Sequence, residues 1–168
     1  MLGGFHNRIA VALEISQKAV ELDPKSAIIR NDYAEVLEKA GRFGEAMENY
    51  RLAIETEPRF AQGYFRIAMF EAQVNGRFDE AVRNLRMAYA IDPESPLVAY
   101  TLVWAYINLG DSPKAAEWLN RLQEIAGGDH WFAVTAEADL LIAQGDNTHA
   151  MKYARKRLEW EPWDNWAL

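Results

Sequence analysis

The side chains in this sequence that are best suited to metal binding are three histidines. His6, His130 and His149 have no mutual helical spacing. Asp129 precedes His130 beside a glycine pair, but no further residue completes a set of metal ligands. A capping or surface role therefore suits His130 better than a metal, and the sequence predicts no cofactor.

Carboxylates are plentiful, and two of them could act as general acid and base if one were desolvated beside a pocket. Glu35, Glu38 and Asp139 are more simply interpreted as a solvated face. The nucleophile elbow, the phosphate-binding glycine loop and the zinc-protease helix are all missing. The absence of cysteine excludes disulfides and thiol chemistry. The sequence therefore does not predict an enzyme.

Composition and charge limit the class of partner. Of the 168 residues, 50% are hydrophobic and 26% are charged, which is typical of a globular chain. The formal net charge of −7 argues against nucleic acid as a partner, because phosphate binding requires a basic face. We find no signal peptide and no apolar stretch near the roughly 18 residues of a spanning helix. We expect a soluble chain without membrane insertion, in the cytoplasm rather than the periplasm.

Glycine, alanine and proline recur along the chain with a period close to 35 residues. Four glycines are separated by 35, 34 and 35 residues: Gly41, Gly76, Gly110 and Gly145. Five residues after each glycine stands an alanine, and 17 residues after it stands a proline or, once, Gly127. Such a repeated ladder indicates a repeat protein.

Each period has the pattern of two helices joined by a turn. Before Gly41, apolar residues recur with a helical period from Ile29 to Leu37, and after it from Phe43 to Ile54. Glycine can adopt the left-handed conformation that ends a helix, and Pro58 prevents the second helix from continuing. Small residues recur in the paired helices of the periods: Ala34, Ala46, Ala53, Ala81, Ala88, Ala115, Ala138 and Ala150. The sequence therefore predicts an all-α fold of antiparallel helix pairs.

This pattern resembles the tetratricopeptide repeat family, whose repeat has about 34 residues, a turn glycine, small crossing residues and a closing proline. The resemblance implies helix-turn-helix repeats stacked as a right-handed superhelical solenoid. We predict a single domain over residues 1–168. It would contain a half repeat at 5–24, full repeats at about 25–58, 59–93, 94–128 and 129–162, and the start of a further repeat at 163–168.

Two of the repeats contain one additional residue. The intervals from the closing proline or Gly127 to the next turn glycine are 17, 18, 17 and 18 residues. In the fourth full repeat we expect the additional residue within 127–131. In the second, we expect it either in the loop before the first helix or in a bulge at 69–73.

The resemblance also implies where a partner would bind, because the first helices of successive repeats line a concave face. Side chains at i, i+4 and i+7 of these helices share one side. Tyr100 and Trp104 lie one turn apart there, and large aromatic residues are frequent binding hot spots, although at helical spacing they are also common in cores. The predicted groove residues are Asn31, Glu35, Glu38, Phe65, Met69, Tyr100, Trp104, Ile107, Asn108 and Asp139.

The kind of ligand follows from the residue types at these positions. Some members of the family bind a C-terminal carboxylate with lysine, asparagine and arginine on this face. The matching positions here are Asn31, Glu35, Phe65 and Met69, so the basic clamp is absent. This favours an apolar or amphipathic segment. Arg59 and Arg66 are the only basic residues close enough to help an acidic ligand, and both are interpreted as solvated surface residues.

The sequence thus predicts a protein–protein interaction module that binds a peptide or helical segment in a concave groove, as part of a larger scaffold or regulatory protein. The alternative is a structural self-assembly domain whose groove is filled by its own chain or by a second copy. Solenoid ends expose apolar surface, so a homodimer through the ends is a further expectation. At the C-terminal end this surface would include Trp160, Trp163 and Trp166.

Overall fold

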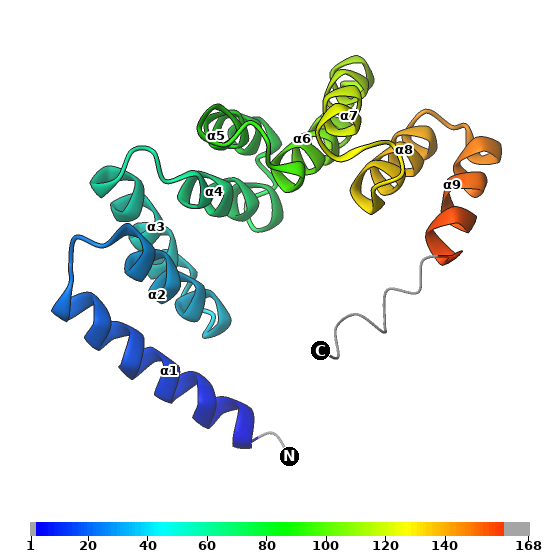
Figure 1. The fold of residues 1–168 in the computed structure, drawn as a ribbon. Coiled ribbons are helices and arrows are strands. Elements are labelled where there is room, and N and C mark those ends of the chain that lie inside the picture. Colours follow the sequence, from blue (N-terminus) through cyan, green and yellow to red (C-terminus); the bar gives the residue numbers. More distant parts are fainter. Residues whose placement is uncertain (1–2, 160–168) are drawn as a thin grey trace. The chain divides into compact units, whose positions relative to one another are not determined.

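A computed structural model describes residues 3–159, with side chains for residues 8–153 and Arg155. The tryptophans at 160, 163 and 166 and the predicted repeat start at 163–168 lie outside this range. Residues 3–159 form nine α-helices (Figure 1). These are α1 (Gly3–Leu22), α2 (Ala27–Lys39), α3 (Phe43–Thr56), α4 (Ala61–Gln73), α5 (Phe78–Ile91), α6 (Pro96–Asn108), α7 (Ser112–Ala126), α8 (Trp131–Ala143) and α9 (Asn147–Glu159).

The helices pack in sequential pairs, α2 with α3, α4 with α5, α6 with α7 and α8 with α9. This confirms the all-α prediction and the helix-turn-helix repeat. Several first helices begin with an N-cap, since the Ser26 hydroxyl accepts from the Ile29 N–H and the Ser95 hydroxyl from the Val98 N–H. Loop residues thus start the helices, and turn glycines end them.

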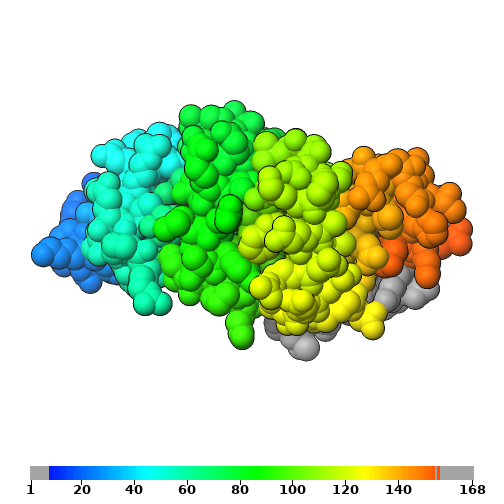
Figure 2. All heavy atoms as spheres, turned by 90° about the horizontal axis from the view of Figure 1, so that it is seen from above, coloured from blue at the N-terminus to red at the C-terminus, as the bar shows by residue number. Residues whose placement is uncertain are grey.

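The chain divides into two compact units, Met1–Asp92 and Pro93–Leu168. In the first unit α1 packs on α2, α3 packs on α4, and α2 also contacts α4. In the second unit α8 packs on both α6 and α7. Within each unit the space-filling view shows successive helices adjoining without a gap (Figure 2). The repeat bounds and the single domain remain predictions.

The turn glycines have the conformation that the ladder predicts. Gly41, Gly76, Gly110 and Gly145 all have φ between 65° and 80°, where a Cβ atom would be strained. At the first turn the Arg42 N–H donates to the Leu37 carbonyl at 2.9 Å, which closes the end of α2. Equivalent bonds, each reaching five residues back, follow α6 and α8.

The turn after α4 is one residue longer than the other three. Here the Arg77 N–H donates to the carbonyl of Glu71, six residues back, at 2.8 Å. The additional residue of the second full repeat therefore lies at 74–75, and both predicted positions are wrong. The longer turn brings Asn75 and Arg77 to the buried Glu71 carboxylate, whose Oε2 accepts from Asn75 Nδ2 at 2.7 Å and from Arg77 Nε at 2.8 Å. These bonds supply hydrogen-bond partners to the carboxylate of Glu71, a residue that is only 5% exposed.

The additional residue of the fourth full repeat belongs to α7. The loop at 127–130 has four residues, as do the loops before α2, α4 and α6. Gly127 caps α7 by donating its N–H to the Gln123 carbonyl, as Glu57 caps α3 by donating to Ala53. Gly127 is thus equivalent to Glu57 and not to Pro58. The sequence-based placement within 127–131 is wrong, because without a proline α7 extends for one more residue.

The core of the first unit lies where α2, α3 and α4 meet. Leu37, Ala46 and Tyr50 are fully buried there, together with Ile67 at 5% exposure. The predicted crossing residues are buried throughout: Ala34, Ala46, Ala53, Ala81, Ala88 and Ala115 are at most 1% exposed, and Ala138 and Ala150 at most 8%. Small side chains at these positions let the paired helices approach closely.

Replacing Arg77 by glutamine is expected to destabilise the chain by about 1–2 kcal/mol at neutral pH, because Glu71 loses a charged partner. Burial opposes ionisation of Glu71, but the hydrogen bonds from Asn75 and Arg77 lower its pKa on balance. A lowered pKa stabilises the fold above the ordinary glutamate pKa of about 4.3, and this contribution is lost as the pH falls through the folded-state value. Urea unfolding from pH 7 to pH 3 should therefore show the two proteins converging. A difference that stays constant with pH would contradict this role for Glu71.

Candidate functional site

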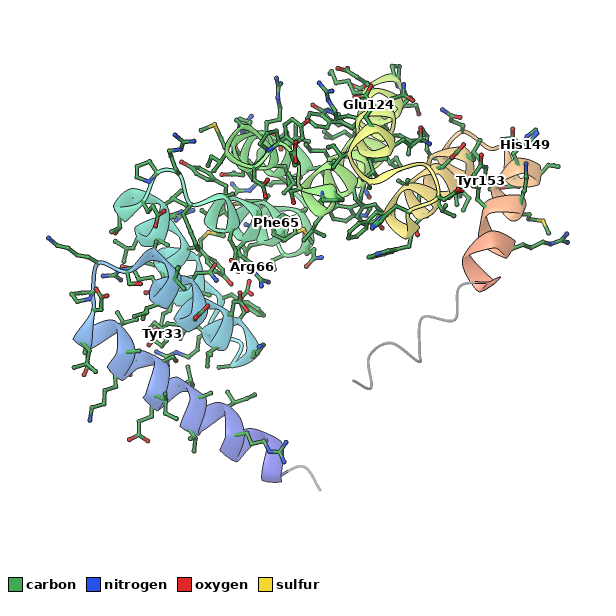
Figure 3. The ribbon with its side chains drawn as sticks, in the orientation of Figure 1. Tyr33, Phe65, Arg66, Glu124, His149 and Tyr153 are labelled. Atoms are coloured by element: carbon green, nitrogen blue, oxygen red, sulfur yellow. The ribbon has the colours of Figure 1, made fainter. Side chains whose placement is uncertain are left out.

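The predicted groove residues of the first unit lie on α2 and α4. These two helices contact each other, and in Figure 1 α3 lies above α2 and α5 lies above α4. Figure 3 places Phe65 and Arg66 on the side of α4 that faces away from α5. The first helices of this unit thus present side chains that are not used in packing against their second helices.

A polar network joins α2 to α4. The Glu35 Oε1 atom accepts hydrogen bonds from Asn31 Nδ2 at 3.1 Å, Gln62 Nε2 at 3.3 Å and Arg66 Nη2 at 2.6 Å. Arg66 is therefore an ion-paired residue with a side chain 33% exposed, and its interpretation as a solvated surface residue is wrong. Asn31 is only 1% exposed, so its buried amide group holds the Glu35 carboxylate in place through their hydrogen bond.

Beside this network lies an open pocket of about 510 Å³. Three predicted groove residues, Glu38, Phe65 and Met69, line it together. The rings of Phe43 and Phe70 are 6.1 Å apart and tilted by 56°. The pocket is lined by Glu38, Lys39, Phe43, Phe65, Arg66, Met69, Phe70, Gln73 and Val74. Five of its nine lining residues are apolar, and its charged residues lie at the end of α2 and beside Phe65.

Sequence reasoning missed three apolar residues of this pocket. Phe43 follows the turn glycine Gly41 by two residues, an aromatic position that Phe78 repeats after Gly76, and it was not placed in the groove, although it is 44% exposed. Phe70 lies off the i, i+4, i+7 series, and Val74 reaches the pocket from the lengthened turn. The aromatic residue after a turn glycine was the one signal that pointed to Phe43.

Glu38 is held at the pocket by the core. Its Oε2 atom accepts a hydrogen bond from the Tyr50 hydroxyl at 3.0 Å. Burial raises the pKa of Tyr50 far above its usual value, and the charge of Glu38 raises it further. Tyr50 therefore remains a neutral donor, which fixes the orientation of Glu38 without neutralising its charge.

In the second unit the predicted residues lie on α6 and α8. Tyr100 stacks on Phe132 with ring centroids 5.0 Å apart, and it lies 6.3 Å from Trp131. Tyr100 therefore takes part in packing between the helices. Trp131 is 49% exposed and extends this aromatic cluster to the surface. The cluster was not predicted, because Trp131 and Phe132 were not among the groove positions taken from the i, i+4, i+7 series.

The remaining predicted residues of this unit differ in accessibility. Trp104, Ile107 and Asp139 are half-buried, and Asn108 is exposed. The Asn108 side chain donates to the carbonyl of Trp104 at 2.8 Å, within its own helix. The unit therefore offers an aromatic and aliphatic face with one carboxylate.

The histidines with described side chains act at helix ends. His130 Nδ1 accepts from the Phe132 N–H at 3.2 Å, which caps α8 as the sequence suggested. His149 donates its backbone N–H to Asp146 and bonds it through its ring, and these two bonds lower the pKa of Asp146. Among the described side chains no group of three histidine, aspartate or glutamate residues is placed to hold a metal ion. No helix within residues 3–159 combines the length and the apolar character needed to cross a membrane.

Comparison with known proteins agrees with this architecture. Two sequence profiles described as tetratricopeptide repeat match residues 5–63 and 75–138. No curated protein matches the chain. Among solved structures, TTC0263, described as a thermophilic TPR protein in Thermus thermophilus, is 22% identical with a TM-score of 0.75, over 95% of this chain and 86% of that one.

Two further structures are similar in fold. MamA is 19% identical with a TM-score of 0.73, over 92% of this chain and 89% of its own. YrrB, described as a TPR protein with an unusual peptide-binding site, is 16% identical with a TM-score of 0.69, over 98% of this chain and 84% of its own. Paired helices, turn glycines and buried crossing alanines define a helical repeat protein. The chain belongs to the tetratricopeptide repeat family, whose domains are generally protein–protein interaction modules and typically non-catalytic.

Proposed function

We propose that this chain binds a peptide or helical segment of a protein partner on the first helices of its repeats, as part of a larger scaffold or regulatory protein. The observation that carries the proposal is the open pocket between α2 and α4, because three of the predicted groove residues, Glu38, Phe65 and Met69, line it together. Large apolar side chains that stay accessible in a folded chain are typical of binding surfaces.

The charges of the first unit support an apolar or amphipathic ligand rather than an acidic tail. Two basic residues line the pocket, Lys39 and Arg66, and Glu35 already pairs with Arg66 at 2.6 Å. In the second unit, Trp104 and Ile107 offer a half-buried apolar face on α6. The peptide-binding site named for the similar structure YrrB is consistent with this use of the fold.

Selection from a phage-displayed library of random peptides on the purified chain tests the proposal. We expect enrichment of peptides with large apolar residues, and we expect their binding to weaken in variants of the two faces, Met69→Asp in the first unit or Trp104→Ala in the second. Urea unfolding of each variant checks that the fold is retained. Failure to enrich any peptide, or enriched peptides that bind both variants as well as the wild type, would contradict the proposal.

A second candidate function is self-assembly, and the surface of α1 favours it. Val11, Ile15 and Leu22 are 48%, 65% and 80% exposed, and they follow one another at helical spacing. A shallow hollow of about 300 Å³ lies among Arg8, Val11, Ala12 and Ile15. A second copy of the chain could cover this apolar stripe.

Replacing Ile15 by lysine is expected to reduce self-association if α1 forms the contact, because a charge would then be desolvated in an apolar interface. Sedimentation velocity over a range of concentrations measures the effect. Gln17→Lys is the matched control, since Gln17 is exposed on the same helix and the charge change is equal. A wild-type chain that is monomeric at all concentrations would exclude this candidate.

A further inference from the structure

We propose that the pocket of the first unit selects segments in which a large apolar side chain adjoins a lysine or arginine. The inference rests on the proposed function and specifies its ligand. The apolar side chain would enter among Phe65, Met69 and Phe70, and the cation would pair with Glu38.

The apolar half of the motif follows from the walls of the pocket. Phe65 and Met69 lie one turn apart on α4, Phe70 directly follows Met69, and Phe43 closes the pocket from the start of α3. Phe43 and Val74 are 44% and 51% exposed, so covering them with an apolar side chain removes apolar surface from water. A methionine beside aromatic rings also adapts to different ligand shapes.

The preference for a cation in the ligand follows from the charges at the pocket, because some of them are already paired and the charge of Glu38 is not. Arg66 and Glu35 neutralise each other across α2 and α4. Among the described side chains Glu38 forms no ion pair and accepts a hydrogen bond from a neutral hydroxyl, that of Tyr50, so its negative charge is not compensated there. Lys39 also lines the pocket, but it is exposed, whereas Glu38 is half-buried. Water screens the exposed ammonium more strongly than the half-buried carboxylate, so the pocket attracts a cation.

Two further observations point the same way. The pKa of the Tyr50 hydroxyl is raised first by burial and then by the negative charge of Glu38, and Arg66 offsets only part of this. The charge of Glu38 therefore acts on a side chain of the core next to the pocket. The chain as a whole carries a formal charge of −7, which steers positively charged segments toward it.

The same phage selection tests this proposal when the charged residues of the enriched peptides are compared. On the wild type we expect enriched peptides in which a large apolar residue adjoins lysine or arginine. Glu38→Gln keeps an acceptor for the Tyr50 hydroxyl and removes the charge. Fluorescence anisotropy with an enriched synthetic peptide should show about 5-fold weaker binding to this variant. Added salt should weaken binding to the wild type more than binding to Glu38→Gln.

Two further variants define the controls. Glu48→Gln removes the same charge from an exposed position on α3 and should leave the affinity unchanged. Glu38→Lys should enrich peptides with aspartate or glutamate beside the apolar residue instead.

The possible failures are distinguishable. Apolar peptides without a charge preference, acidic peptides enriched on the wild type, or equal binding by Glu38→Gln would overturn the charge selection and leave the proposed function standing. Absence of any enriched peptide would overturn the proposed function itself.

Discussion

Replacing Leu37 by alanine is expected to lower the free energy of unfolding by about 2–5 kcal/mol. Leu37 is fully buried on α2 and belongs to one cluster with Ala46 and Tyr50 of α3 and Ile67 of α4. Its truncation would leave a cavity at the point where three helices meet. Because each repeat is stable only against its neighbours, the loss should be felt beyond α2.

Urea unfolding followed by circular dichroism measures this loss, and hydrogen exchange locates it. We expect faster exchange in α2, α3 and α4 of the variant. Leu22→Ala is the matched control, because Leu22 is 80% exposed at the end of α1 and should change stability by less than about 0.5 kcal/mol. Equal effects of the two substitutions would show that Leu37 is not part of a shared core.

The second large effect concerns binding. Met69→Asp is expected to weaken the binding of an enriched peptide by about 10- to 100-fold, the size of a hot-spot substitution. Met69 is half-buried and lines the pocket, so the new carboxylate would be desolvated against the apolar side chain of the ligand. The fold should persist, because the side chain is not part of the buried core.

Met87→Asp separates this effect from a general effect of charge. Met87 is 49% exposed on α5 of the same unit and does not line the pocket, so its substitution should leave the affinity unchanged. Anisotropy titrations of both variants with one peptide make the comparison. A Met69→Asp protein that binds as tightly as Met87→Asp would move the binding surface away from α4.

The architecture was accessible from the sequence because it depends on local rules repeated along the chain. Each of the four turn glycines has a positive φ, and a Cβ atom is disfavoured there regardless of the rest of the fold. The crossing alanines are buried for an equally local reason, since helices that lie close together tolerate only small side chains at the contact. Because the repeat occurs several times, the turn glycine and the crossing alanines can each be recognised in several repeats.

The additional residue near Asn75 was not accessible in this way. Spacing shows that one repeat is longer, but it does not show which segment extends. The position depends on Glu71, which is buried and whose partners Asn75 and Arg77 reach it only from a longer turn. Whether a buried carboxylate will find such partners is a property of the folded chain.

The candidate site was predicted only in part for the same reason. The i, i+4, i+7 rule placed Phe65 and Met69 on one side of α4, where they do line one pocket. It could not show that Arg66 pairs with Glu35, because those residues are 31 positions apart and meet only when α2 lies beside α4. That contact changes the chemistry of the face, since Glu35 already pairs with one of the two cations at the pocket that could hold an acidic ligand.

The most direct test of the account is an NMR titration of the isotope-labelled chain with an enriched peptide. The proposed binding face predicts the largest chemical-shift changes at Glu38, Phe65, Met69 and Phe70 on α2 and α4. Residues on the exposed side of α5, such as Met87, should be unaffected. Changes concentrated on α3 and α5 instead, with α2 and α4 unperturbed, would contradict the central claim that the first helices bind the partner.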